Sequence, residues 1–209
     1  MKTSISFLSS KFSVLETLIK IDNTDADLVH VDIMDGKFTD NKFVEIDCLK
    51  QTILSKPLDV HLMTYNITSW IEKFDYLNVS NITFQYEANE DIKQIIKIIK
   101  SKKINAGIAL NPETDISVLM PYINDIDIVL LLGVKPGKGG QEFIESTLDK
   151  IKQLKKIKKE NHCNFKIEVD GGVNDTNAKD IKKAGCDILV SGSFICKRNN
   201  FQEQLDLIK

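Results

Sequence analysis

The chain has 209 residues, with 28 basic and 30 acidic side chains and a formal net charge of −2. This balance gives no reason to expect a nucleic-acid partner or an acidic membrane surface as a partner. No apolar run approaches the roughly 18 residues of a membrane span, and the early polar residues are not those of a signal peptide, so we expect a cytoplasmic protein. Four cysteines without C-x-x-C spacing fit reduced thiols in that compartment.

Short apolar segments alternate with amphipathic segments along the whole chain. The segment 91–102 carries isoleucines on one stripe and lysines opposite, which is typical of an amphipathic helix. The segment 127–134 is almost wholly apolar, as expected of a strand buried on both faces. The predicted strands cover 3–8, 27–33, 58–63, 81–85, 105–110, 127–134, 166–170 and 187–191, and the predicted helices cover 14–21, 44–53, 67–77, 91–102, 116–123, 145–160, 176–184 and 201–208.

Eight strand and helix pairs of about 25 residues each are the pattern of a (β/α)₈ TIM barrel. We therefore predict an α/β fold with a single barrel domain over residues 1–209. The alternative is an open, doubly wound sheet. Such a sheet would carry a glycine fingerprint after its first strand, and the segment Leu8–Ser10 contains no glycine.

Metal-capable side chains stand at the ends of three predicted strands. Side chains alternate along a strand, so His30 and Asp32 point to the same face. His61 lies near the end of the strand 58–63, and Asp170 comes just before two glycines. Because the carboxyl ends of barrel strands meet at one mouth, we expect these four side chains to converge. Two imidazoles and two carboxylates suit one divalent ion, and Zn²⁺, Fe²⁺, Mn²⁺ and Co²⁺ all accept such ligands.

Glycine-rich loops follow the last three predicted strands. They are the segments 134–140, 171–172 and 191–193. Glycines let backbone N–H groups approach an anion closely, and the last loops of a TIM barrel commonly bind phosphate. A phosphorylated small molecule is therefore the predicted ligand.

These motifs resemble those of the ribulose-phosphate 3-epimerase family, metal-dependent barrel enzymes that interconvert ribulose 5-phosphate and xylulose 5-phosphate. The most specific matches are the segments His30–Gly36 and Glu168–Val173. The resemblance covers the chain from end to end and implies a barrel of the ribulose-phosphate-binding type. The remaining matching segments are 6–9, 59–63, 111–112, 136–137, 139–141 and 191–193.

The resemblance assigns a role to each matching position. It implies that His30, Asp32, His61 and Asp170 bind the metal, and that Asp32 and Asp170 also exchange protons with the substrate as the catalytic residues. It also implies that the protein forms a homo-oligomer. The substrate-binding residues it implies are Ser6, Met34, Met63, Gly137, Gly139, Gly140, Gly171, Gly172, Gly192 and Ser193.

The chemistry of such an epimerase agrees with two carboxylates beside a metal. The proton at carbon 3 of a 2-ketose is acidic because the neighbouring carbonyl takes up charge, and a metal on that oxygen stabilises the enediolate. Epimerisation removes the proton on one face and returns it on the other, so it needs one base and one acid. The sequence leaves open which aspartate starts in which role.

Several positions depart from the usual pattern of the family. Gln85 stands where the family usually has a histidine, and Leu132 stands where a methionine is expected. Asp40 replaces a proline, and Lys135 and Lys138 add positive charge to the loop after the sixth strand. These lysines are either solvated surface groups or additional contacts for an acidic substrate.

The departures leave the sugar open. A hexulose-phosphate 3-epimerase, acting for example on allulose 6-phosphate, is the alternative of the same reaction type. A non-catalytic sugar-phosphate-binding barrel is a third hypothesis, against which the pair Asp32 and Asp170 argues. A lyase or decarboxylase would place lysines among the acids at the strand ends, and none stands beside this pair.

Overall fold

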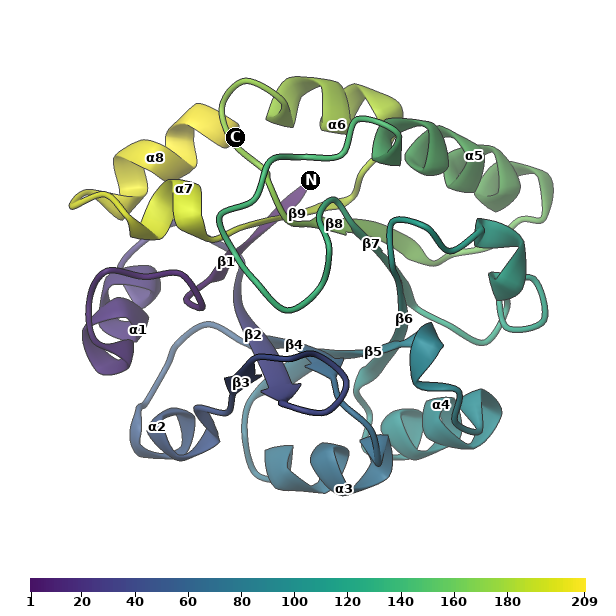
Figure 1. Ribbon diagram of the computed structural model, residues 1–209, viewed down its shortest axis with the longest axis horizontal. Helices are drawn as coiled ribbons and strands as arrows, with labels where there is room; N and C mark the ends of the chain where they lie inside the picture. Colours follow the sequence, from purple (N-terminus) through teal and green to yellow (C-terminus); the bar gives the residue numbers. More distant parts are fainter.

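The structure is a computed structural model that describes residues 1–209, and it is a closed barrel of parallel strands surrounded by helices (Figure 1). Strand β1 pairs with both β2 and β9 in parallel, which closes the sheet into a ring. The TIM barrel prediction is therefore confirmed, and the open sheet is wrong. The barrel strands are β1 (Lys2–Ser6), β2 (Leu28–Asp35), β4 (Leu58–Met63), β5 (Val79–Gln85), β6 (Asn105–Leu110), β7 (Ile128–Leu132), β8 (Lys166–Asp170) and β9 (Ile188–Ser191).

Helices follow most of the strands and pack on the outer wall. A core of 49 buried residues lies between them and the barrel. None of the helices combines the length and the apolar character that a membrane crossing requires. The helices are α1 (Val14–Asp22), α2 (Ile46–Gln51), α3 (Ile67–Ile71), α4 (Ile92–Ser101), α5 (Thr147–Glu160), α6 (Ala178–Ala184), α7 (Ser193–Cys196) and α8 (Phe201–Ile208), with 3₁₀ turns η1 (Glu72–Phe74), η2 (Tyr86–Ala88) and η3 (Ile116–Leu119).

Helix α4 shows how the sequence pattern places a helix on the wall. Its isoleucines Ile92, Ile95, Ile96 and Ile99 are buried, while lysines cover the opposite face. Asp91 begins the helix by accepting a hydrogen bond from the backbone N–H of Gln94 at 3.1 Å. Burying an isoleucine contributes roughly 1.5–3 kcal/mol, so the apolar stripe fixes the face that α4 turns to the barrel.

Several outer connections differ from the prediction: α7 was not predicted, the helix expected over 67–77 ends at Ile71 and continues as η1, and two further segments have another structure than expected. The helix expected over 116–123 is the single turn η3, because Pro121 cannot donate a backbone hydrogen bond to continue it. Asp115 caps this turn by accepting from the backbone N–H of Ser117. The other of these segments is β3 (Lys42–Phe43), a short antiparallel strand that pairs with the end of β2.

The register of the barrel aligns the strand ends that carry polar residues. Asp32 of β2 pairs with His61 of β4, and His30 of β2 pairs with Ser6 of β1. At the opposite end, Leu28, Ile128 and Ile188 form an apolar layer inside the barrel. Because these residues begin β2, β7 and β9, they seal the floor and leave the polar groups facing the mouth.

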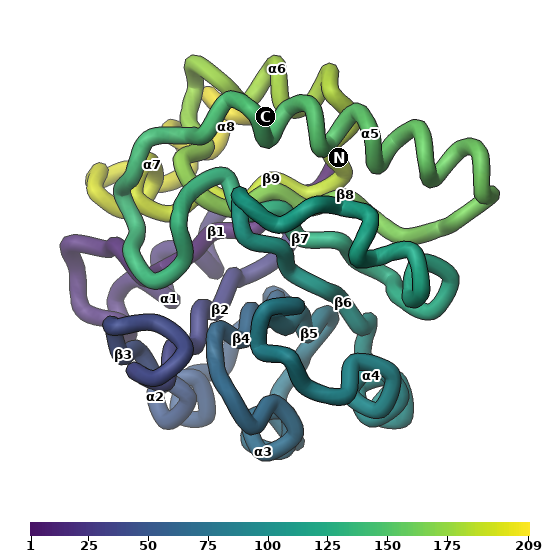
Figure 2. Tube along the Cα trace, turned by 45° about the vertical axis from the view of Figure 1, so that its right-hand side comes forward, coloured from purple at the N-terminus to yellow at the C-terminus, as the bar shows by residue number.

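One long connection extends over the mouth. The segment between β7 and α5 runs from the end of β7 towards β1 and α7 before it returns to α5 (Figures 1 and 2). A Cβ atom placed on Gly139 of this segment would lie 2.0 Å from the hydroxyl of Ser9, so the loop passes very close to the loop after β1. This segment therefore forms one wall of the opening above the strand ends.

Candidate active site

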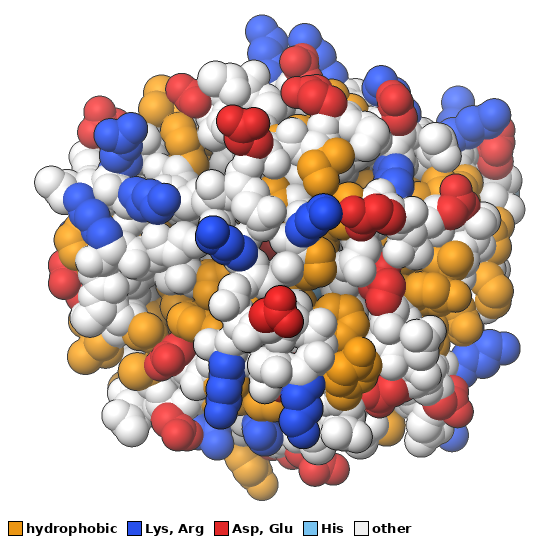
Figure 3. Space-filling model, viewed as in Figure 1, with side chains coloured by type: hydrophobic (Ala, Val, Ile, Leu, Met, Phe, Trp, Pro, Cys, Tyr) orange, Lys and Arg blue, Asp and Glu red, His pale blue; other side chains and the backbone are white.

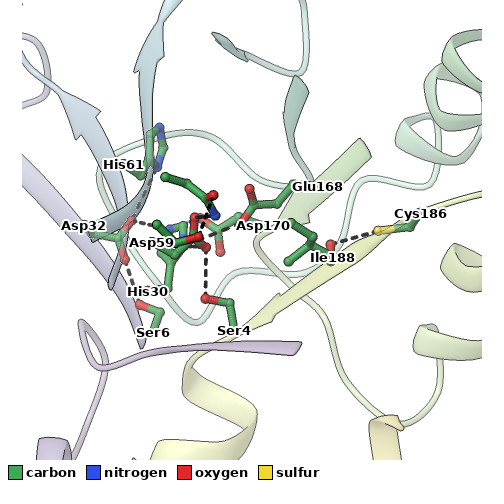
Figure 4. A network of polar contacts seen from close by, with 12 residues as sticks. Ser4, Ser6, His30, Asp32, Asp59, His61, Glu168, Asp170, Cys186 and Ile188 are labelled. Atoms are coloured by element: carbon green, nitrogen blue, oxygen red, sulfur yellow. Dashed lines mark hydrogen bonds and ion pairs between the residues drawn. The ribbon is translucent and has the colours of Figure 1, made fainter. Parts of the chain in front are cut away.

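Two histidines and two aspartates converge where β2, β4 and β8 end (Figure 4). His30, Asp32, His61 and Asp170 each offer one ligand atom, and these atoms all lie within 4.8 Å of one another. His30, Asp32 and His61 are buried, and the side chain of Asp170 is 17% exposed. The structure thus brings together all four predicted metal ligands.

His30 has one ring nitrogen occupied and one free. Its Nδ1 lies 3.0 Å from Oδ2 of Asp59, so this nitrogen donates to the carboxylate. Its Nε2 is buried without a hydrogen-bond partner, 3.5 Å from Asp32 and 3.8 Å from Asp170. Asp59 is held in turn by Ser4 and Asn81, each at 2.9 Å. This chain of contacts orients the free nitrogen of His30 towards the two predicted catalytic carboxylates.

His61 presents its free nitrogen to the same point. Its Nε2 lies 2.8 Å from Oε1 of Gln85, whereas its Nδ1 is buried without a partner and lies 3.5 Å from Oδ1 of Asp32. Orphaned buried nitrogens are rare and unfavourable in folded proteins. Here two such nitrogens face two carboxylates. A divalent cation bound between them would be coordinated by all four groups, so these residues fit the predicted metal.

The surroundings separate the two aspartates electrostatically. Burial raises the pKa of Asp32, but the charge of His30 and polar contacts with His30 and His61 outweigh burial and hold this pKa well below its usual range. Burial and then the charge of Asp32 raise the pKa of Asp170 to about 6. For His30, burial lowers the pKa, yet the charge of Asp32 and its contacts with Asp32 and Asp59 raise it well above its ordinary value. The two carboxyls therefore differ in their affinity for a proton.

A second acidic layer lies below the four predicted metal ligands. Glu168 of β8 is fully buried, and neither of its carboxyl oxygens has a hydrogen-bond partner. Burial, followed by the charge of Asp59, raises the pKa of Glu168 well above its usual range. The sequence motifs predicted no role in the site for Asp59, Glu168 or Gln85. The alternation of strands was a usable signal for two of them, because Asp59 and Glu168 stand two residues before His61 and Asp170 and so share their faces.

An open cavity lies above the side chains of the four predicted metal ligands. Ser6 stands at its base and donates to Oδ2 of Asp32 at 2.7 Å. Met34 does not line this cavity, since it is buried beside the neighbouring hollow near β3. The other predicted substrate-binding residues all line it: Ser6, Met63, Gly137, Gly139, Gly140, Gly171, Gly172, Gly192 and Ser193.

The glycines of the cavity have little space for side chains. Gly172 has a φ of +72°, and a Cβ atom there would lie 2.7 Å from the backbone of Phe143. Lys135 and Lys138 also line the cavity, and basic side chains flank the centre of this face (Figure 3). The Nζ atom of Lys197 comes within 3.4 Å of a Cβ position on Gly140. Exposed backbone and positive charge together suit an anionic group.

Solved structures with the same fold have distant sequences. The tryptophan synthase alpha-subunit of Pyrococcus furiosus, in a mutant form, superposes with a TM-score of 0.71 at 16% identity and covers 99% of this chain and 96% of that one. The N-(5'-phosphoribosyl)anthranilate isomerase of the same organism gives 0.68 at 14% identity, over 100% and 96% of the two chains. These likenesses establish the barrel fold alone.

Sequence relatives are much closer. The chain is 38% identical to the ribulose-phosphate 3-epimerase of Helicobacter pylori over 93% of this chain and 90% of that protein. It is 35% identical to the enzyme of the same name from Escherichia coli K12, with 96% and 91% covered, and 35% identical to that of Bacillus subtilis, with 100% and 98% covered. The model of the ribulose-phosphate 3 epimerase family matches residues 2–196. The chain therefore belongs to the ribulose-phosphate 3-epimerase family.

Proposed function

We propose that the protein is a metal-dependent isomerase that interconverts D-ribulose 5-phosphate and D-xylulose 5-phosphate by epimerisation at carbon 3. One observation carries the proposal: two carboxylates and two orphaned imidazole nitrogens converge under a glycine-lined cavity. A site that only bound a sugar phosphate would not need two carboxylates of unequal proton affinity. The relatives from Helicobacter pylori, Escherichia coli and Bacillus subtilis carry the name of this activity.

Four side chains are the proposed ligands of one divalent ion, Zn²⁺, Fe²⁺, Mn²⁺ or Co²⁺. They are Nε2 of His30, Nδ1 of His61 and the carboxylates of Asp32 and Asp170. When bound, such a cation supplies positive charge that stabilises the negative charge developing on the oxygens of the substrate. Asp59 holds His30 by accepting from Nδ1, which leaves Nε2 free as a ligand.

The two aspartates are the proposed proton carriers. Asp32 stands on β2 and Asp170 on β8, and β1 and β9 separate these strands on the shorter way around the barrel. The carboxylates therefore reach the cavity from different strands, and a ligand oxygen of each lies within 4.8 Å of the other. One removes the proton from carbon 3, and the other delivers a proton to the opposite face of the planar enediolate. Ser6 donates to Asp32 and holds this carboxylate in place at the base of the cavity.

The phosphate of the substrate is proposed to lie at the glycine-rich side of the cavity. Gly140, Gly171, Gly172 and Gly192 expose backbone there, and Ser193 adds a hydroxyl. Holding the phosphate fixes the distance between the anchored end and the carbon that exchanges its proton. Lys135 and Lys138 line the same cavity and add positive charge at the mouth.

Solvent deuterium incorporation at carbon 3 tests the mechanism. Metal-loaded wild type in heavy water should exchange this proton with both epimers, ribulose 5-phosphate and xylulose 5-phosphate, and interconvert them. Asp32→Asn and Asp170→Asn should each reduce interconversion by about 10²- to 10⁴-fold. Each variant should keep exchange with one epimer only, because the remaining aspartate still serves one face, and the retained epimer should differ between the two variants.

Asp40→Asn is the matched control, because it changes an exposed carboxylate near the mouth and should leave turnover close to normal. Either single variant that interconverts the epimers at the wild-type rate would contradict the two-aspartate mechanism. Allulose 6-phosphate in a parallel sample tests the sugar. Exchange with this six-carbon substrate alone would refute the pentulose assignment and keep the reaction type.

A further inference from the structure

Gln85 ends β5 beside the cluster and is almost completely buried. Its Oε1 lies 2.8 Å from Nε2 of His61. The residue neither lines the substrate cavity nor belongs to the four clustered ligands. The buried amide of Gln85 forms hydrogen bonds only with other side chains of the protein. Its role therefore follows from these hydrogen-bond partners.

The partners of the Gln85 amide determine its orientation. Its Nε2 lies 3.0 Å from Oε2 of Glu87 and 2.7 Å from Oδ1 of Asn111. The carboxyl oxygens of Glu87 act as acceptors in this network, so the NH₂ group of Gln85 faces Glu87 and donates to it. Its carbonyl oxygen then faces His61 and can only accept. Nε2 of His61 therefore carries the hydrogen, and the lone pair of Nδ1 points towards Asp32.

The partners of Gln85 are themselves held from outside the barrel. Oε1 of Glu87 accepts from the backbone N–H of Asn111 at 2.8 Å and from the hydroxyl of Thr114 at 2.5 Å. Lys150 of α5 reaches the same loop and donates to the backbone carbonyl of Thr114 at 2.5 Å. The carboxylate of Glu87 thus has two donors besides Gln85 and cannot turn away without losing them. The orientation of the Gln85 amide is therefore fixed by the loop that holds Glu87.

We propose that Gln85 is a positioning residue that holds His61 in the tautomer whose Nδ1 faces the metal ligands. The inference rests on the proposed function, because it concerns how His61 meets the cation. It also defines a difference between the two imidazoles. His30 donates to the carboxylate of Asp59, whereas His61 donates to a neutral amide. Only the first partner adds negative charge to its histidine.

Gln85→Met tests the inference, because methionine has a similar length but offers no comparable acceptor to Nε2 of His61. Without that acceptor the histidine can place its hydrogen on either nitrogen. We expect the dissociation constant for Zn²⁺, measured by competition with a chromophoric chelator, to rise about 10- to 100-fold. Gln85→His should restore most of the affinity, because a ring nitrogen can accept from His61 and the other can donate to Glu87 or Asn111.

Thr83→Val is the matched control. Thr83 lies on the same strand and face as Gln85, is buried, and has a hydroxyl without a hydrogen-bond partner. Its removal changes the polarity of β5 without touching the contacts of Gln85. Zn²⁺ affinity of this variant should equal that of the wild type. A loss as large as in Gln85→Met would overturn the positioning role, because any polar change on β5 would then weaken the site.

The tautomer of His61 provides a second readout that needs no metal. In ¹⁵N-labelled, metal-free protein, two-bond correlations from the ring protons distinguish protonated Nε2 from protonated Nδ1. The wild type should show Nε2 protonated, and Gln85→Met should show a mixture or the other tautomer. An unchanged tautomer with unchanged Zn²⁺ affinity in Gln85→Met would overturn the inference. A wild-type protein that binds no Zn²⁺ would instead overturn the proposed metal site, and the inference with it.

Discussion

The Asp170→Asn substitution should change the stability and the activity of the protein in opposite directions, with stability measured on the metal-free protein. Asp170 is placed among buried groups, and burial and the charge of Asp32 raise its pKa from 3.8 to about 6. At neutral pH the folded chain therefore holds a carboxylate in surroundings that disfavour its charge. Asparagine has nearly the same shape and no charge, so the variant should be more stable than the wild type while losing epimerase activity.

The pKa of Asp170 sets the size and the sign of the effect. A rise from 3.8 to about 6 corresponds to at most about 3 kcal/mol, at 1.36 kcal/mol for each pKa unit. Because the folded-state pKa is above the unfolded value, the folded chain binds this proton more tightly. The stability from this group is fully present below about pH 4 and is lost as the pH rises through about 6. The difference between variant and wild type should therefore be small at about pH 4 and largest near pH 8.

Urea unfolding of both proteins after metal removal, at about pH 4 and about pH 8, measures this difference. Asp175→Asn is the control, because it neutralises an exposed carboxylate near the same loop. Zn²⁺ at about pH 8 should stabilise the wild type more than Asp170→Asn, since the cation offsets the charge of the carboxylate. An Asp170→Asn variant that is less stable than the wild type at about pH 8, or a difference independent of pH, would refute the reasoning.

Two further predictions concern the cation and the phosphate. Dialysis against a chelator should abolish epimerisation, and added Zn²⁺, Fe²⁺, Mn²⁺ or Co²⁺ should restore it; full activity of protein shown to be metal-free by elemental analysis would contradict the proposed site. Gly172→Ala should destabilise the fold by about 1–2 kcal/mol through its positive φ alone, with a further loss from the contact with Phe143. The KM of this variant for ribulose 5-phosphate should be higher than that of the wild type. If urea unfolding and KM were both unchanged, Gly172 would not be part of the phosphate site.

The barrel and the convergence of the two histidines and two aspartates were readable from local sequence patterns. Strand periodicity placed His30 and Asp32 on one face, because side chains alternate strictly along an extended chain. Repeated strand and helix pairs predicted a barrel, since parallel strands require crossover helices. The rule that the strand ends meet at one mouth then grouped residues that are up to 140 positions apart, from His30 to Asp170. These inferences depend only on the period of the backbone and on the direction of the strands.

Tertiary structure decided the features that depend on several strands at once. Closure required β1 to pair with β9, and no local pattern encodes such a contact between the two ends of the barrel. The difference in proton affinity between Asp32 and Asp170 arises from burial and from charges on other strands. The contact of Gln85 with His61 likewise depends on Asn111, which belongs to the loop after β6. Sequence thus determined which side chains stand at the strand ends. Packing across the barrel determined the proton affinities and the orientations of these side chains, because electrostatics and hydrogen bonding act through space.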